Sequence, residues 1–252
     1  MEEAVLAGAR RIDYVAAVRG RADQRVQRIL DACRERKIPV RFIDREQLER
    51  MAGRNTVHQG IAAVIAEAEY LELEELLQQK RGERHFLLVL DGVEDPHNLG
   101  ALLRTADATG CDGVVIPERR AVGVNATVAK ASAGASEYVA VAKVVNVNRA
   151  IEEMKERGVW IVGLDERGTQ TYDEAELTGD VAIVLGAEGA GLHEQVRKRC
   201  DFLVRIPMQG RVSSLNVSVA GGIIMSEVAR QRRATMPKAS ARQEKVKRGL
   251  GS

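Results

Sequence analysis

Residues 13–66 alternate short apolar stretches with amphipathic ones. Apolar side chains recur every three to four positions within 21–37, which predicts a helix with one buried face. A second, shorter helix is expected over 44–53, with Asp44 as its N-cap and Gly53 at its end. Three strands are expected around these helices, over 13–18, 38–43 and 61–67. This part of the chain therefore predicts a small α/β unit.

From Phe86 onward the pattern changes to apolar runs separated by helical stretches. The expected strands are 86–91, 113–117, 138–144, 160–165, 181–186 and 202–207. The expected helices cover 99–109, 127–133, 147–157, 192–199 and 215–232. Apolar strands without clear alternation, separated by helices, indicate a mainly parallel sheet that is covered on both faces. Such sheets bind their ligands at the carboxyl ends of the strands, so a functional site is expected there.

Two charged stretches flank this larger unit. Residues 71–85 are polar on most sides and are expected to form a linker with a helical turn or two. From Arg230 to the end there are eight Lys and Arg residues against one acid, Glu244. A tail with so few apolar residues is expected to be disordered. It either keeps the protein in solution or contacts a nucleic-acid backbone through its cations.

The composition of the chain indicates where in the cell the protein is located and which kinds of ligand it binds. The chain has 252 residues, of which 45% are hydrophobic, yet no apolar run approaches the roughly 18 residues of a membrane span. Its acidic start, MEEAVLAGARRIDYV, is unlike a secretory signal. The three cysteines are far apart and outside any CxxC pairing, which excludes a zinc ribbon and a disulfide framework and favours the reducing cytoplasm. Aromatic residues make up only 3%, which argues against RNA recognition by base stacking.

The first candidate segment is LDGVEDPHNLGALLRTADATG, residues 90–110, at the end of the first strand of the larger unit. Asn98 is expected to cap a helix that starts at Leu99. Arg104 falls outside the apolar stripe of that helix and is expected on roughly the same side as Asn98, near the strand ends. His97 taken alone is weak support for acid–base chemistry.

The second segment, VLGAEGAGL at 184–192, places glycines after a buried strand. Their spacing, G-x-x-G-x-G, differs from the G-x-G-x-x-G of dinucleotide sites and follows the fifth strand rather than the first. An NAD-dependent oxidoreductase is therefore not favoured. A glycine turn lets a ligand approach the backbone closely. A carboxylate inside that turn has no evident structural role, so Glu188 is a candidate functional residue.

The third segment, IPMQGRVSSLNVSVAGG at 206–222, runs from the last strand through a loop into the final helix. Ser213 or Ser214 is expected to cap that helix, whose free N–H groups would face the strand-end crevice. Gly221 and Gly222 each cost about 1 kcal/mol relative to Ala in the middle of a helix, so they indicate close helix packing.

The three segments together resemble the SpoU/TrmH family of SPOUT-class RNA ribose 2′-O-methyltransferases. The matching residues are NLGALLRTA at 98–106, LGAEGAGL at 185–192 and IPMQGRVSSLNVSVA at 206–220. The N-terminal unit, in DQRVQRILDACRERKIPV and HQGIAAVIAE, is also similar to the ribosomal-protein-like RNA-binding domain of the 23S rRNA (guanosine-2′-O-)-methyltransferase subgroup. The domains expected from this resemblance are an RNA-binding domain at 1–70, a linker at 71–85, the methyltransferase domain at 86–233 and the basic tail at 234–252.

The resemblance implies an α/β fold with a C-terminal trefoil knot, an exception to the rule that chains do not thread loops. It implies S-adenosylmethionine as the methyl donor, with no metal. The expected contacts to this cofactor are Gly186, Ile206, Leu215, Gly189, Met208 and Gly210. Enzymes of the family are homodimers with the active site at the subunit interface, so Arg104 is expected to act near the partner's cofactor.

The resemblance also implies which residues carry the chemistry. The expected catalytic residues are Arg104, Asn98, Glu188, Ser214 and Asn216. A ribose hydroxyl is a poor nucleophile at neutral pH, so the protein has to orient it and help remove one proton. Because a guanidinium hardly ever deprotonates, Arg104 is expected to clamp a phosphate and stabilise the developing alkoxide, with proton removal through Glu188 or solvent. The expected RNA contacts in the N-terminal unit are Arg19, Arg21, Arg54 and His58.

The expected substrate is a guanosine of 23S rRNA, because a further domain precedes the methyltransferase domain. The alternatives are guanosine methylation of tRNA and the adenosine methylation of 23S rRNA that confers thiazole-antibiotic resistance. A non-catalytic RNA-binding assembly factor is a further alternative, against which the intact polar residues of the three segments argue. Relatives generally carry a longer lead-in segment, so the RNA-binding domain is expected to be reduced or to start upstream.

Overall fold

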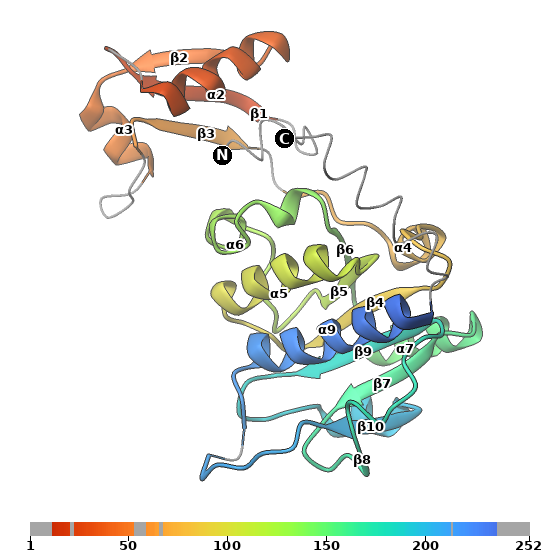
Figure 1. Ribbon diagram of the computed structural model, residues 1–252. Coiled ribbons are helices and arrows are strands. Elements are labelled where there is room, and N and C mark those ends of the chain that lie inside the picture. The colour runs from red at the N-terminus through yellow and green to blue at the C-terminus, as the bar shows by residue number, and fades with distance from the viewer. Residues whose placement is uncertain (1–11, 21–22, 53–58, 66–67, 213, 236–252) are drawn as a thin grey trace.

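The computed structural model describes residues 12–20, 23–52, 59–65, 68–212 and 214–235. It contains two sheets, one of three strands near the N-terminus and one of seven strands (Figure 1). Every strand that the sequence predicts is found within a few residues of its expected bounds. The predicted α/β class is therefore confirmed.

In its described residues, the N-terminal unit is a three-stranded sheet, in the order β2-β1-β3, with two helices. Its elements are β1 (Ile12–Val18), α2 (Gln24–Glu35), β2 (Val40–Ile43), α3 (Arg45–Ala52) and β3 (Ile61–Ile65). β1 pairs parallel with β2 and antiparallel with β3. The side chain of Asp23 accepts the backbone N–H of Val26 at 2.8 Å and so caps α2. The apolar face of α2 packs in the core of this unit, as its helical spacing predicts.

The larger unit is built on a seven-stranded sheet in the order β6-β5-β4-β9-β7-β10-β8, and its neighbouring strands pair in parallel. Its strands are β4 (Phe86–Asp91), β5 (Gly113–Pro117), β6 (Ala140–Val144), β7 (Trp160–Leu164), β8 (Gln170–Thr171), β9 (Val181–Gly186) and β10 (Phe202–Arg205). The sequence does not predict β8, because a strand of two residues leaves no periodicity. The trefoil knot stays a prediction.

Helices cover both faces of this sheet, as the unbroken apolar strands predict (Figure 1). They are α4 (Leu73–Gln78), α5 (Pro96–Thr109), α6 (Ala126–Ala131), the 3-10 helix η1 (Ala135–Glu137), α7 (Val147–Glu156), α8 (Glu194–Arg199) and α9 (Val217–Thr235). Successive residues of β4 face opposite cores. Phe86 and Leu88 pack in the core that includes α5 and α9, whereas Leu87 and Val89 pack with α4, α7 and α8. In the described part of the chain, no helix is long and apolar enough to cross a membrane.

The stretch between the two units is packed more firmly than a linker. Leu73, Leu76 and Leu77 of α4 are buried in the core on one face of the larger sheet. Just before α4, Leu71 forms a parallel bridge with Ala142 of the edge strand β6. The expected helical turn or two is thus present as α4, but its burial is not predicted, because charged residues stand between the leucines and six residues are too few to show a period. The domain boundaries themselves stay a prediction.

An arginine that the sequence assigns to the basic tail belongs to the folded part of α9. The guanidinium of Arg232 donates to the carbonyl oxygens of Arg84, His85 and Gly179 at 3.0, 2.6 and 2.7 Å. These carbonyls lie just before β4 and β9. Arg232 therefore fastens the end of α9 to the sheet and is not available to a nucleic-acid backbone.

Gly221 and Gly222 have different surroundings, although the sequence predicts close packing for both. A Cβ on Gly221 would lie 2.4 Å from Cδ2 of Leu102 and 2.8 Å from Cδ1 of Leu185. Close packing of α9 against α5 and β9 is thereby confirmed at this position. A Cβ on Gly222 would meet no described atom within 4 Å, so within one chain the predicted close packing is not found there.

Alanine substitutions at these two glycines are expected to change the free energy of unfolding in opposite directions. Gly221→Ala overpacks a buried contact and is expected to destabilise the protein by about 1–3 kcal/mol. Gly222→Ala adds helix propensity alone and is expected to stabilise it by up to about 1 kcal/mol. Urea unfolding of both variants measures the difference. A loss of stability in Gly222→Ala would contradict this expectation and indicate that a further surface packs against α9.

Candidate active site

The three segments singled out in the sequence meet at the carboxyl ends of β4 and β9. These strands are neighbours, and Asp91 at the end of β4 pairs with Gly186 at the end of β9. Nδ2 of Asn98 donates to Oε2 of Glu188 at 3.2 Å. Nδ2 of Asn216 donates to Oδ1 of Asn98 at 3.0 Å and to Oε1 of Glu188 at 3.2 Å. The structure thus joins Asn98, Glu188 and Asn216 in one group, called here the amide–carboxylate cluster.

Asn98 enters this cluster from inside α5 and not as its cap, which corrects the prediction. α5 begins at Pro96, and its N-cap is Asp95, whose side chain accepts the backbone N–H of His97 at 2.8 Å. Proline is favoured in this first position because a helix leaves its first N–H groups unpaired in any case. Since Asp95 already caps the helix, the buried side chain of Asn98 is free to reach the neighbouring loops.

Asn216 takes the cap position that the sequence predicts for Ser213 or Ser214. Its Oδ1 accepts the backbone N–H groups of Ser218 at 2.9 Å and of Val219 at 3.4 Å, in the first turn of α9. Ser214 lies before the helix, and Ser213 lies outside the described residues. Because Oδ1 is used by the cap, Nδ2 is left to donate to the cluster, and the helix decides which way the amide points.

Glu188 stands at the tip of the glycine turn that follows β9. The backbone N–H groups of Ala187 and Gly191 each donate to the other's carbonyl oxygen, at 3.1 and 2.9 Å, and close the turn. Gly189 and Gly191 have φ values of 77° and 69°, in the left-handed region that favours glycine. The glycine spacing therefore serves a tight turn that presents a carboxylate.

One anchor of this turn is not predicted from the sequence. Asp91, which is 5% exposed, accepts the backbone N–H of His193 through Oδ2 at 2.8 Å. Its other oxygen, Oδ1, lies 3.0 Å from Nδ1 of the same histidine. Both carboxylate oxygens thus hold the residue just beyond the turn, which positions the turn and Glu188 with it. The available signal was an acidic residue at the end of an otherwise apolar strand.

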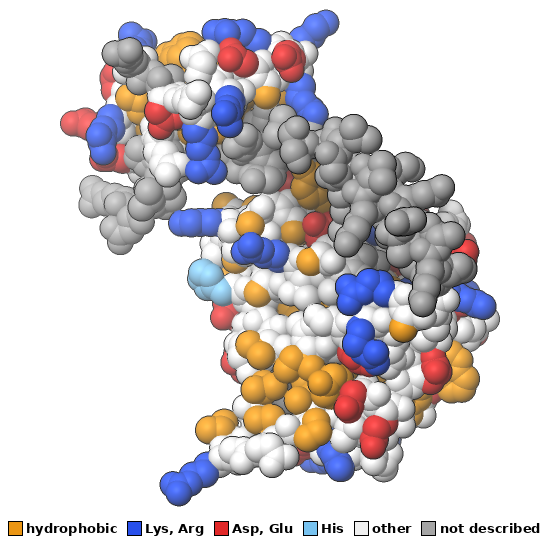
Figure 2. Space-filling model, in the orientation of Figure 1, with side chains coloured by type: hydrophobic (Ala, Val, Ile, Leu, Met, Phe, Trp, Pro, Cys, Tyr) orange, Lys and Arg blue, Asp and Glu red, His pale blue; other side chains and the backbone are white. Residues whose placement is uncertain are grey.

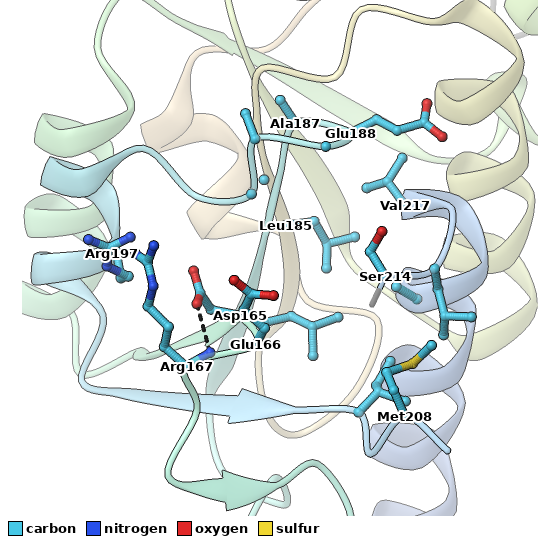
Figure 3. A pocket seen from close by; sticks show the side chains of 18 residues that line it. Asp165, Glu166, Arg167, Leu185, Ala187, Glu188, Arg197, Met208, Ser214 and Val217 are labelled. Carbon is cyan, nitrogen blue, oxygen red and sulfur yellow. Dashed lines mark hydrogen bonds between the residues drawn. The ribbon is translucent and has the colours of Figure 1, made fainter. Parts of the chain in front are cut away.

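A cavity of about 360 Å³ opens beside the turn, lined by residues from the ends of β7 and β9, the loop after β10 and the start of α9 (Figure 3). The predicted site residues that line it are Gly186, Glu188, Gly189, Ile206, Met208, Ser214 and Leu215. Gly210, which the sequence also assigns to the cofactor site, is not part of this lining. The structure adds charged lining residues that the sequence does not predict, namely Asp165, Glu166, Arg167 and Arg197.

This cavity has an apolar side and a charged side. Figure 3 shows Leu185 and Met208 on one side, and Arg167 and Arg197 next to each other on the other. The carboxylate of Asp165 lies between these two groups (Figure 3). The arrangement suits a ligand with an apolar part and a charged part.

Arg104 is the predicted catalytic residue that the structure does not bring to the cluster. It is exposed on α5, lies outside the cavity wall and forms no ion pair with a described carboxylate. The expectation that it shares a side with Asn98 does not hold, because six residues turn a helix by about 240° and advance it by about 9 Å. Within one chain, Arg104 therefore has no contact with the site.

Of the predicted RNA contacts, Arg19 alone falls in the described part of the chain. It is exposed just after β1, where its Nε donates to the carbonyl oxygen of Phe42 at 3.4 Å. Arg21, Arg54 and His58 lie outside the described residues. RNA binding by these side chains stays a prediction.

Neither a metal centre nor an activated thiol accompanies the cluster in the ranges that the structure describes. These ranges contain no group of three or more His, Cys, Asp or Glu side chains that could hold a metal ion. Burial raises the pKa of the Cys111 thiol to about 12. Burial likewise raises the pKa of Cys200 to about 12. Both thiols stay protonated at neutral pH, so neither is a nucleophile.

Comparison with known proteins agrees with this geometry. The model of the SpoU rRNA Methylase family matches residues 85–226, and the model described as RNA 2′-O ribose methyltransferase substrate binding matches residues 2–71. A protein of Bacillus subtilis (strain 168), YacO, carries a name that places it in the TrmH family of tRNA/rRNA methyltransferases. It is 45% identical to this chain over 217 residues, which are 85% of each protein.

Solved structures share the fold. The SpoU methyltransferase AviRb from Streptomyces viridochromogenes, in complex with the cofactor AdoMet, has a TM-score of 0.80 at 23% identity. The match covers 93% of this chain and 88% of AviRb. A TrmH/SpoU tRNA modifying enzyme of A. aeolicus has a TM-score of 0.56 at 28% identity, over 68% of this chain and 91% of its own. Because the first family model covers more than half of the chain and the Bacillus relative is 45% identical, the chain belongs to the SpoU/TrmH family of methyltransferases.

Proposed function

We propose that this protein transfers a methyl group from S-adenosylmethionine to the 2′-hydroxyl of a ribose in RNA. The observation that carries this proposal is that Glu188 belongs both to the amide–carboxylate cluster and to the wall of the cavity. A carboxylate held at the edge of a ligand cavity can accept a proton from a hydroxyl placed beside it. Membership of the family and the match of its substrate-binding model support the same activity.

The residues of the cavity fit S-adenosylmethionine. Leu185, Ile206 and Leu215 form an apolar wall that suits an adenine ring, and the charged side suits an amino acid. A Cβ on Gly186 would lie 2.1 Å from the carbonyl carbon of Gly191, so the wall at this point is bare backbone. When bound, the cofactor supplies a methyl group on a positively charged sulfur, which is reactive without further activation.

The cluster prepares Glu188 to act on a hydroxyl group. Each oxygen of its carboxylate accepts one amide hydrogen, from Asn98 and from Asn216. These bonds hold the carboxylate in one orientation and leave lone pairs open on both oxygens. We assign proton acceptance to Glu188 and the orientation of the reacting groups to Asn98, Asn216 and Ser214, which also lines the cavity.

We infer a homodimer in which Arg104 of one subunit completes the site of the other. Hydrophobic side chains gather on the surface over the start of α9 and the loop before it (Figure 2). Among them Met208, Val212 and Val219 are 39%, 69% and 50% exposed. An apolar patch beside a cavity is typical of a protein interface. A guanidinium brought there by a second copy would hold an RNA phosphate and stabilise the developing alkoxide.

Mixed dimers of two defective variants test this arrangement. Arg104→Ala and Glu188→Gln are each expected to be nearly inactive alone. If the two residues meet across the interface, a mixed dimer has one site with both defects and one site with neither. Random exchange of subunits in a twofold dimer is therefore expected to restore about a quarter of the wild-type methylation rate. No recovery, with exchange verified by native mass spectrometry, would contradict a shared site.

We propose 23S rRNA as the substrate and a guanosine as the modified nucleotide. The family descriptions support a ribosomal substrate and a dedicated binding unit that covers residues 2–71. On this basis residues 1–70 bind the RNA, 71–85 connect the units and 86–233 carry the transfer reaction. The basic residues of 234–252 add positive charge for the RNA backbone. We place the protein in the cytoplasm, where ribosomal RNA is found.

Transfer RNA is the second candidate substrate. The name of the Bacillus relative includes tRNA, and the A. aeolicus protein is a tRNA modifying enzyme. That enzyme matches 68% of this chain, whereas AviRb matches 93%. Part of this chain therefore has no counterpart in the A. aeolicus enzyme. This additional part favours a substrate other than tRNA.

Methyl transfer from labelled S-adenosylmethionine distinguishes these substrates. The purified protein is incubated with unmodified 23S rRNA or with tRNA, and the RNA is then cleaved by alkali. Label in an alkali-resistant dinucleotide identifies ribose methylation, because a 2′-O-methyl group blocks cleavage at its phosphate. Label is expected in 23S rRNA. Cofactor binding without transfer to either RNA would support an RNA-binding factor, and absence of cofactor binding would overturn the proposed activity.

A further inference from the structure

We propose that the loop between β5 and α6, residues 118–124, is the surface on which the RNA strand lies beside the site. In this arrangement Arg119 and Arg120 hold phosphate groups next to the ribose that is methylated. The inference rests on the proposed function, because it concerns the substrate of the same reaction. It places RNA contacts in a loop of the larger unit to which the sequence assigns none.

The order of the strands leaves one side of the amide–carboxylate cluster for the substrate. The residues that line the cavity all lie between Leu164 and Ala220, so the cavity occupies the half of the sheet that contains β9, β7 and β10. β4, β5 and β6 form the other half. Glu188 follows β9, at the boundary between the two halves. A ribose that reaches Glu188 from outside the cavity therefore lies over the loops after β4 and β5.

The loop after β5 reaches the glycine turn that follows β9. A Cβ on Gly92 would lie 3.5 Å from Cβ of Ala187, in that turn, and 3.9 Å from the carbonyl oxygen of Arg120. The backbone N–H of Val122 donates to the carbonyl oxygen of Val93 at 3.1 Å. The loops after β4, β5 and β9 thus meet at one point. The two arginines are therefore next to the turn that presents the carboxylate of the cluster.

Both arginines of this loop are open to an anionic ligand. Arg119 and Arg120 are exposed, and among the described residues no carboxylate oxygen lies within 4.0 Å of either guanidinium. Glu118 is the single acid of residues 118–124, so the loop carries a net positive charge. Arg120 has a φ of 58°, a conformation that is uncommon outside glycine and is found preferentially at ligand sites. The planar fork of a guanidinium matches the oxygens of a phosphate group.

Tyr70 holds this loop in place from the segment before α4. Its hydroxyl oxygen accepts the backbone N–H of Val124 at 2.8 Å. A Cβ on Gly123 would lie 2.7 Å from the same oxygen, so a side chain there would displace the hydroxyl. Nζ of Lys143 lies 4.0 Å from the centroid of the Tyr70 ring, which fixes the ring from its face. Since Tyr70 belongs to the stretch that matches the substrate-binding model, residues 2–71, this stretch also positions the loop beside the cluster.

Neutral variants of the two arginines test the inference through RNA affinity. Filter binding to unmodified 23S rRNA at several salt concentrations compares the wild type with Arg119→Gln/Arg120→Gln. The double variant is expected to bind the RNA about 10–100-fold more weakly, because it loses charge-assisted contacts to phosphate. The slope of log affinity against log salt concentration is expected to fall by about 0.7 for each arginine.

Arg157→Gln is the matched control for this experiment. Arg157 caps the end of α7 just before β7, so it lies at the opposite end of the sheet from the loop. Its ion pairs with Glu74 and Glu153 are partly exposed and long, at 3.5 and 3.6 Å. The RNA affinity of this variant is therefore expected to stay within about twofold of the wild type.

Tyr70→Phe tests the positioning of the loop separately from its charge. It removes the oxygen that accepts the N–H of Val124. The KM for RNA is expected to rise about 3–10-fold, whereas kcat at saturating RNA stays near the wild-type value. A purely structural role would lower kcat and cofactor affinity as well, so the difference between KM and kcat distinguishes the two roles.

S-adenosylhomocysteine, the cofactor without its methyl group, reports on the cavity in the same variants. Isothermal titration calorimetry is expected to give wild-type affinity for each of them. Wild-type RNA affinity and salt dependence in the double arginine variant would overturn the inference and leave the proposed activity standing. Parallel losses of RNA and cofactor affinity would also overturn it, because the loop would then support the cavity. If the wild type transfers no methyl group, the proposed activity fails, and the RNA affinities of the variants still decide whether the loop binds RNA.

Discussion

Replacing Glu188 with Gln is expected to lower kcat/KM for ribose methylation by about 10²–10⁴-fold, the range for loss of a positioned acid–base group. Gln keeps the size of the side chain but has no carboxylate to accept the hydroxyl proton. In addition, both oxygens of Glu188 accept amide hydrogens, from Asn98 and Asn216 at 3.2 Å each. One of these donors would face the NH₂ group of Gln, so the orientation would suffer too. Single-turnover rates with saturating S-adenosylmethionine measure the loss.

Glu156→Gln is the matched control for this experiment. Glu156 is exposed at the end of α7 and lies outside the cavity lining, so its rate is expected to stay within about twofold of the wild type. The affinity of Glu188→Gln for S-adenosylhomocysteine is expected to change little, because the side chain keeps its shape. A near-normal rate in Glu188→Gln would remove this residue from the chemistry and leave the proton to solvent.

The sheet and the location of the site could be predicted because their signals are local. β4 and β9 are six-residue strands that are buried at every position and apolar apart from Asp91, and such runs indicate strands covered on both faces. The carboxyl ends of parallel strands share one edge of a sheet, so Glu188 was expected near the segment that holds Asn98. The role of each polar residue came from the family resemblance, because a lone Asn or Glu has no periodicity.

The caps of α5 and α9 could not be predicted, because several residues that can cap lie close together at the start of each helix. Asp95 and Asn98 are both capable of capping α5, and Pro96 decides for Asp95. Asn216 competes in the same way with Ser214 before α9. Because α5 starts at Pro96, Asn98 lies within the helix and its side chain reaches the cluster. Because α9 starts at Val217, Asn216 is its cap and donates to the cluster through Nδ2. The sequence shows the candidates but not the start of the helix.

The charged side of the cavity could not be predicted either, because its residues lie on separate elements. Arg167 follows β7, whereas Arg197 belongs to α8, and only the fold brings them to one wall. In the sequence, each of these arginines taken alone is typical of a solvated surface residue. The position of Arg104 in the complete site depends on a second subunit, whose arrangement is not encoded in any local pattern.

Gly186→Ala is expected to disrupt the site by displacing the backbone of the glycine turn. A Cβ at this position would lie 2.1 and 2.2 Å from the carbonyl carbon and oxygen of Gly191 and 2.3 Å from the nitrogen of Leu192. These are backbone atoms of the turn that carries Glu188, so no change of rotamer can relieve the contact. Overpacking of this kind costs about 1–3 kcal/mol, and at about 2–4 °C per kcal/mol it lowers Tm measurably. Displacement of the turn by about 1 Å is expected to lower turnover by about 10²-fold.

Gly179→Ala separates the effect of this contact from the general cost of replacing a glycine in the same unit. A Cβ on Gly179 would meet no described atom within 4 Å, so its Tm is expected to change by less than about 2 °C. Calorimetric melting and titration with S-adenosylhomocysteine are compared for both variants. Since Gly186 lines the cavity, its variant is expected to lose cofactor affinity as well as stability, whereas Gly179→Ala keeps both. Wild-type melting and wild-type affinity in Gly186→Ala would show that the turn can move aside freely, and the view of Glu188 as rigidly presented would have to be abandoned.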